Sequence, residues 1–194
     1  MKRKLDQPGG APWKQSLAKY IKDPQDHPDI VVKHTADFVI IKDMYPKSKI
    51  HQLLMPTRTK ISSMWELCKL DLPLLNILKR AAQETKDLHP SFNIKIGFHA
   101  VPSMSTLHLH MIGNDLTGDY LKTKAHYKSF TTPFFIELED ILECMNSNDD
   151  LFARFGMGTN SSLELSELNS RYHELLKGKP NRLMIRQSFQ CQLS

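Results

Sequence analysis

Cysteine is scarce in this chain of 194 residues, and long apolar runs are absent. The three cysteines, Cys68, Cys144 and Cys191, are widely spaced and odd in number, which argues against a disulfide framework and indicates a reducing compartment. No apolar stretch approaches the length of a membrane span, and no apolar run follows the charges at the amino terminus. The sequence therefore predicts a soluble, intracellular protein without a membrane partner.

The two signs of charge are unevenly distributed along the chain. The 26 lysines and arginines exceed the 21 aspartates and glutamates, which gives a net charge of +5, and the acids cluster late, in residues 137–150 and 164–174. The first 130 residues are therefore more basic than the average suggests, which suits a polyanionic partner such as nucleic acid. Charge alone favours the simpler explanation, a solvated basic surface that needs no partner.

The segment with the most reactive side chains is residues 97–112, GFHAVPSMSTLHLHMI. Apolar residues and histidines alternate from Leu107 to Ile112, and because side chains of a strand alternate between its faces, His108 and His110 are expected on one face. A third imidazole, His99, lies just upstream of a Pro-Ser-Met-Ser turn. Such imidazoles suit a zinc site, general acid and base catalysis, or nucleophilic attack on phosphorus. A bare His-x-His is also typical of the polar face of a half-buried sheet.

Four segments, in order and spacing, resemble the aprataxin branch of the histidine triad nucleotide hydrolases and transferases. One is the motif His-φ-His-φ-φ, in which φ is an apolar residue, together with the preceding GFHAVPSMS. The others are residues 13–17 (WKQSL), 39–51 (VIIKDMYPKSKIH) and 121–130 (LKTKAHYKSF). The resemblance covers roughly residues 11–135 and implies an α+β histidine triad fold, an antiparallel sheet with flanking helices covering one side. It implies no metal cofactor.

The resemblance also implies roles for individual residues. His108 would be the nucleophile and His51 the proton donor to the leaving group, while His110, His99 and the turn residues Ser103, Met104 and Ser105 would stabilise charge on the phosphate. Asp43 would hold the ribose hydroxyls, and Lys47 would neutralise charge nearby. Three further residues would contact DNA: Trp13 by stacking on an exposed base pair, and Lys124 and His126 at the phosphate beside the scissile bond.

The activity implied is removal of AMP from 5′-adenylated DNA ends through an adenylyl-histidine intermediate, in single-strand break repair. The partner implied is DNA with nicks or 5′-adenylated ends. We expect AMP as the product, a monomer, and a nuclear location, to which Lys2-Arg3-Lys4 adds weak support. Two alternatives stay open: a general histidine triad hydrolase of small nucleotide conjugates, and a DNA-end binding module without catalysis. The general hydrolase does not explain Trp13 or the Lys124-Ala125-His126 segment.

The chain departs from the family pattern in two places. Thr106 stands where the first triad histidine is expected, although its hydroxyl can still donate or accept a hydrogen bond. Near the carboxyl end, Cys191 matches the first ligand of a family zinc finger, but Ser194 stands at the second cysteine position, so zinc is not expected. The predicted organisation is a disordered tail over 1–10, a catalytic domain over 11–146, and a helical extension over 147–194 with a vestigial or truncated finger.

Local patterns predict the main elements. A helix is expected over 13–21, strands over 30–32, 38–41, 50–55 and 92–100, and a capped helical region over 61–88 with Pro73 in the first turn of the long helix. Residues 121–130 are expected to form a basic loop with aromatic residues, and 164–177 a helix. Cys68 is expected in the core because its surroundings are apolar.

Overall fold

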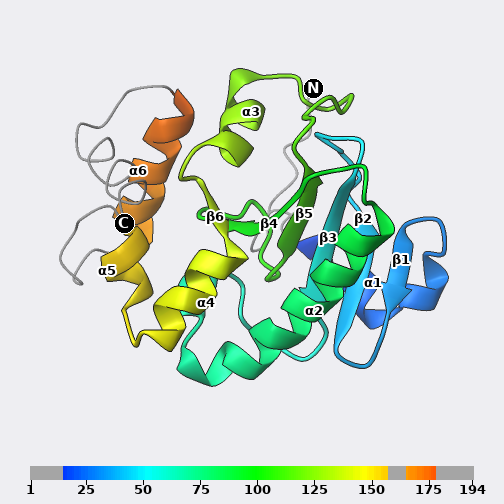
Figure 1. The fold of residues 1–194 in the computed structure, drawn as a ribbon, viewed down its shortest axis with the longest axis horizontal. Helices are drawn as coiled ribbons and strands as arrows, with labels where there is room; N and C mark the ends of the chain where they lie inside the picture. The colour runs from blue at the N-terminus through cyan, green and yellow to red at the C-terminus, as the bar shows by residue number, and fades with distance from the viewer. Residues whose placement is uncertain (1–14, 157–164, 178–194) are drawn as a thin grey trace, which may run out of the picture.

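The computed structural model describes residues 15–156 and 165–177 and contains one six-stranded antiparallel sheet (Figure 1). The strand order is β1-β2-β3-β5-β4-β6, and every neighbouring pair is antiparallel. The strands are β1 Val31–His34, β2 Phe38–Lys42, β3 His51–Pro56, β4 Ile94–His99, β5 Leu109–Gly113 and β6 Phe135–Glu137. This sheet with its flanking helices is the predicted α+β architecture.

Helix α2 (Leu72–Leu88) covers one face of the sheet. Its buried residues recur at helical spacing, from Leu75 and Leu78 to Ala81, Ala82 and Thr85, and Pro73 lies in its first turn as predicted. Before it come two short 3-10 turns, Met64–Glu66 and Lys69–Asp71. The main core forms between α2 and the sheet residues of this face, among them Leu54, Leu109 and Met111.

The opposite face of the sheet is covered at two places, and the histidines lie between them. Helix α1 (Ala18–Lys22) packs through Tyr20 on a cluster that includes Val39, Leu53 and Met55. Helix α3 (Lys124–Thr131) contributes Phe130 to a second cluster with Ile112 and Phe135. Helices therefore lie on both sides of the sheet, and the expectation that they cover only one side is wrong. A further 3-10 turn, Pro24–Asp26, follows α1.

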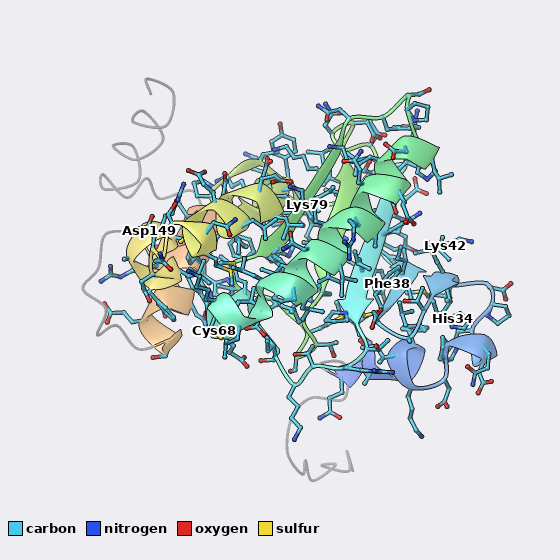
Figure 2. The ribbon with its side chains drawn as sticks, turned by 60° about the horizontal axis from the view of Figure 1, so that its bottom comes forward. His34, Phe38, Lys42, Cys68, Lys79 and Asp149 are labelled. Atoms are coloured by element: carbon cyan, nitrogen blue, oxygen red, sulfur yellow. The ribbon has the colours of Figure 1, made fainter. Side chains whose placement is uncertain are left out.

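Three helices complete the described chain: α4 (Leu138–Asn146), α5 (Leu151–Phe155) and α6 (Leu165–Lys177). Helix α4 lies beside α2 (Figure 2), where Lys79 pairs with Glu139 at 2.8 Å. Tyr172 of α6 belongs to the main core, and its hydroxyl donates to the carbonyl of Phe155 at 2.5 Å. In the described residues, no helix is long and apolar enough to cross a bilayer.

Three local predictions are corrected by the structure. Within the described residues, the helix expected over 13–21 is only the short helix α1, Ala18–Lys22. The expected loop over 121–130 contains α3, which begins because the Thr123 side chain accepts a hydrogen bond from the His126 N–H. Cys68 is exposed at the start of the segment that leads into α2 (Figure 2). The predicted tail over 1–10, Trp13, and Cys191 with Ser194 lie outside the described residues.

Candidate active site

Four histidines from three neighbouring strands converge on the sheet face opposite α2. His51 opens β3 opposite Ile112 of β5, His110 lies within β5, and His99 ends β4. His108 lies one residue before β5, and its ring centroid is 5.0 Å from that of His110. The alternation predicted for His108 and His110 therefore brings both to one face, and strand pairing adds His51 and His99.

The main chain fixes the tautomer of His108. Its Nδ1 lies 2.6 Å from the carbonyl oxygen of Thr106, and because a carbonyl only accepts, Nδ1 carries the proton. The neutral ring then has its lone pair on Nε2. A lone pair in a fixed direction is what a nucleophilic imidazole requires.

A second main-chain contact sets the direction of a hydrogen-bond chain through His51. The N–H of Lys47 donates to His51 Nδ1 at 3.2 Å, so the proton of His51 is on Nε2. That Nε2 lies 3.1 Å from His110 Nδ1. His110 must accept there and carry its own proton on Nε2.

The proton-bearing Nε2 of His110 has no partner among the described residues, and neither has the Nε2 of His99; both atoms are buried. The rings of His110 and His99 are 4.2 Å apart between centroids, and Phe130 packs against His99 at 4.7 Å and His110 at 5.5 Å. An unpaired buried donor costs about 1–3 kcal/mol. A donor left free beside His108 suits an incoming ligand oxygen.

Burial keeps these imidazoles neutral. It lowers the pKa of His51 to about 4, although the nearby Asp43 opposes the shift. Burial also lowers the pKa of His108, against the opposing effects of the Thr106 carbonyl and Asp43. The pKa values of His99 and His110 fall well below the ordinary value, first through burial and then through neighbouring imidazoles. At neutral pH these four imidazoles supply lone pairs and N–H donors rather than positive charge.

Asp43 and Lys47 lie in the β2–β3 connection and reach the same site. Asp43 Oδ2 is 3.6 Å from His51 Nε2, and Oδ1 accepts the N–H of Tyr45 at 2.6 Å. Lys47 is half-buried, and burial lowers its pKa against the attraction of Asp43. The structure therefore brings both residues, expected at the ribose and the phosphate, beside His51.

Asp43, His51 and His110 also offer three ligand-type atoms within 4.8 Å of one another. The hydrogen bonds do not suit a metal here. The Lys47 N–H directed at Nδ1 places the His51 proton on Nε2, and a protonated nitrogen has no lone pair for a cation. His51 and His110 therefore form a hydrogen-bonded pair, and the Asp43 carboxylate lies 3.6 Å from His51 Nε2.

The turn before His108 lies against the region of α1. Ser103 and Ser105 are exposed, whereas Met104 is half-buried on the α1 cluster, and its Sδ accepts from the Ser16 hydroxyl at 3.4 Å. Trp13 lies outside the described residues. Ser16 itself lies beside the turn that precedes His108.

Helix α3 carries two residues that are expected to contact DNA and one residue that packs on the histidines. Lys124 is exposed and His126 is half-buried at its start, and Phe130, one turn after His126, packs on the rings of His51, His99 and His110. Sequence reasoning missed Phe130 as the wall of the site. The available signal was its spacing of four from His126, which places both side chains on one helix face.

The chain is similar to known proteins in sequence and in fold. Residues 15–126 match the family model described as scavenger mRNA decapping enzyme C-term binding. Aprataxin of Ciona intestinalis is 41% identical over 134 residues, which are 67% of this chain and 34% of that protein. Aprataxin of Danio rerio is 34% identical over 164 residues, 83% of this chain and 48% of that protein.

A solved structure, "Crystal structure of aprataxin ortholog Hnt3 in complex with DNA", superposes with a TM-score of 0.57 at 25% identity, over 85% of this chain and 97% of that one. The chain spans between a third and a half of the length of these two curated aprataxins.

Proposed function

Because the chain belongs to the scavenger mRNA decapping enzyme C-terminal binding family and is an aprataxin-type histidine triad protein, we propose that it is a hydrolase that removes AMP from 5′-adenylated DNA ends. The substrate is a DNA strand whose 5′ phosphate is joined to AMP through a pyrophosphate link. We propose single-strand break repair in the nucleus as the setting of this activity. The related Hnt3 was solved in complex with DNA.

The hydrogen bond from His108 Nδ1 to the Thr106 carbonyl is the observation that most supports this proposal. It leaves Nε2 of the neutral ring unprotonated, and the lone pair of Nε2 attacks the AMP phosphorus. The Nε2–P bond forms as the P–O bond to the DNA phosphate breaks, and the positive charge on the ring is stabilised by the same carbonyl. Water then breaks the Nε2–P bond, which releases AMP and restores neutral His108.

The neighbouring groups would stabilise charge on the phosphate. We assign this role to the Nε2–H of His110, supported by His99, and to donors of the Ser103-Met104-Ser105 turn. Asp43 would hold the ribose, and Lys47 would offset phosphate charge. His51 is neutral in the free protein, with its proton on Nε2. Bound phosphates raise imidazole pKa values, so we propose that it takes up a second proton on Nδ1, in exchange for the Lys47 N–H bond, when substrate binds. It would then give its Nε2 proton to the departing DNA phosphate and be neutral again.

The DNA side of the site would lie along the α1 end of the chain and α3. Trp13 would stack on the base pair at the exposed end, and Lys124 and His126 would contact the phosphate beside the scissile bond. The N–H of Lys122 donates to His126 Nδ1 at 3.2 Å, so the Nε2–H of His126 is available to an anionic oxygen.

The test is AMP release from a nicked duplex that carries a 5′-adenylate, compared with an adenosine conjugate lacking DNA. We expect rapid release on DNA, and His108→Ala should slow it by more than about a thousandfold. The matched control is His34→Ala, since His34 is an exposed histidine of β1. Intact-protein mass spectrometry after an acid-free quench should show one added adenylyl group that His108→Ala lacks.

Two other outcomes would support the alternative functions. Release from the small conjugate alone would identify a general nucleotide hydrolase. Retention of adenylated DNA with no AMP release would identify an end-binding module, and either result would overturn the proposed activity.

A further inference from the structure

Trp65 contacts the chain that leads from β4 to His108. The residue is 7% exposed, and its indole Nε1–H donates to the carbonyl oxygen of Ala100 at 2.6 Å. Ala100 is fully buried and directly follows His99, the last residue of β4. The N–H of Ala100 donates to the Phe134 carbonyl at 2.9 Å. Both main-chain groups of Ala100 are therefore held by buried residues at the point where the chain enters the turn.

The segment that contains Trp65 also holds the other end of this turn. The N–H of Leu107, the residue directly before His108, donates to the Ile61 carbonyl at 3.2 Å. Within the described residues, no main-chain hydrogen bond joins residues 101–106 to another main-chain group. We call residues 61–65 the clamp, because its two ends hold the two ends of the turn.

The indole of the clamp is itself held in place. The Ser63 hydroxyl accepts the main-chain N–H of Trp65 at 3.3 Å and so caps the 3-10 turn that carries the indole. Phe152 of α5 packs on the indole with ring centroids 4.9 Å apart, and Tyr172 of α6 lies at 6.0 Å. These contacts restrict rotation of the ring, so its N–H stays directed at one carbonyl.

The turn held by the clamp carries groups on which the proposed reaction depends. Residues 103–105 supply the donors assigned to the phosphate, and the Thr106 carbonyl fixes the proton of His108. Such groups stabilise a transition state only when they are already in place, and a displacement of about 1 Å can slow a reaction by about a hundredfold. A turn that is held at its ends takes its position from those ends.

We infer that Trp65 is a positioning residue of the histidine site: its indole N–H, through the Ala100 carbonyl, sets the position of the 101–106 turn beside His108. This inference rests on the proposed function and adds to it a residue of the main core, which lies between the sheet and α2. Loss of the N–H should slow catalysis without weakening substrate binding, because the turn is still present but less well placed. A residue that only fills the core would change stability and leave turnover by the folded protein unchanged.

The experiment replaces Trp65 by 3-benzothienylalanine, which keeps the two fused rings and has sulfur in place of the N–H, and compares this variant with Trp65→Phe. AMP release from the 5′-adenylated nicked duplex is measured with the full chain at a temperature where every variant is folded. Both variants should lower kcat by about tenfold and change KM by less than about twofold. The matched control is Leu75→Ala, which removes volume from the same core at α2 and should leave kcat and KM unchanged. A wild-type kcat in the benzothienyl variant, or an equal loss in Leu75→Ala, overturns the inference.

Amide hydrogen exchange tests the clamp without relying on turnover. In the benzothienyl variant, the hydrogen-bonded amides of Ala100 and Leu107 should exchange about tenfold faster than in wild type. The amide of Gly113, which donates to the Ile50 carbonyl at 2.9 Å at the other end of β5, should keep its rate. Unchanged exchange at Ala100 and Leu107, or an equal increase at Gly113, overturns the clamp. Faster exchange at the two sites in a protein that releases no AMP rejects the deadenylase activity alone, whereas AMP release with unchanged exchange rejects the clamp alone.

Discussion

Acid should destabilise this protein through its buried histidines. Burial lowers the pKa of His51 from its ordinary value of 6.5 to about 4, with Asp43 opposing, and burial lowers the pKa values of His99, His108 and His110 in the same direction. Between these pH values the unfolded chain binds more protons than the folded one. The free energy of unfolding therefore falls as the pH falls. The stabilisation is fully present above the pKa of the unfolded chain and is lost as the pH falls toward the pKa of the folded state.

The magnitude can be worked out for His51. Between pH 7.5 and pH 5, a folded pKa of about 4 against an unfolded 6.5 gives a loss of about 2 kcal/mol. The other three imidazoles act in the same direction, so this is the smallest loss expected. Asp115 adds nothing in this range: burial raises its pKa, but hydrogen bonds from Ser48, Thr117 and Lys49 outweigh burial and hold it below 3.8.

The assay is urea unfolding at pH 7.5 and pH 5. Equal dependence of the unfolding free energy on urea concentration at the two pH values shows that the same transition is measured. His51→Gln should reduce the difference between the two free energies by about 2 kcal/mol. His34→Gln, on the exposed strand β1, should leave the difference unchanged. Equal wild-type stability at the two pH values would refute the reasoning, as would a full pH dependence in His51→Gln.

Three further predictions test the site and its frame. Thr106→His should change kcat/KM for AMP release by less than about tenfold, or about 1.4 kcal/mol. The reason is that the Thr106 carbonyl, not its side chain, holds His108. A larger gain would show that the side chain matters. Gly118→Ala should lower the free energy of unfolding by about 1–3 kcal/mol, since its Cβ would meet main-chain atoms of 46–48 at 2.4–2.6 Å; unchanged urea unfolding would contradict the loop packing. A chelator should leave AMP release unchanged because the His51 Nε2 carries a proton, and loss that zinc restores would contradict this assignment.

Local patterns predict part of this site, and their limits are physical. The face shared by His108 and His110 follows from the period of two, since Leu109 and Met111 must turn to the core. His51 joins His110 only through the pairing of β3 with β5, across 59 positions, and no local pattern encodes such a pairing. Here the family resemblance supplied it.

Two of the three corrected local predictions share a cause. Residues 121–130 are polar and basic enough to suggest a loop, yet one buried side, Ser129 and Phe130, and the Thr123 cap are sufficient for α3. Cys68 has apolar neighbours in sequence, but the 3-10 turns on either side rotate it to the surface. In both places tertiary contacts, rather than average composition, decide which side chains are buried.

The main chain, rather than the missing triad histidine, orients the reactive imidazoles. The Thr106 carbonyl fixes the proton of His108 on Nδ1, and the Lys47 N–H fixes the proton of His51 on Nε2. Both groups are present whatever side chain stands at 106. Strand geometry therefore preserves the lone pair of His108, our proposed nucleophile, and the N–H donor of His110 when threonine stands there. Substitutions that shift the 102–106 turn or the 43–50 connection should therefore harm catalysis more than a change of the side chain at 106, because they would move the backbone groups that fix the two tautomers.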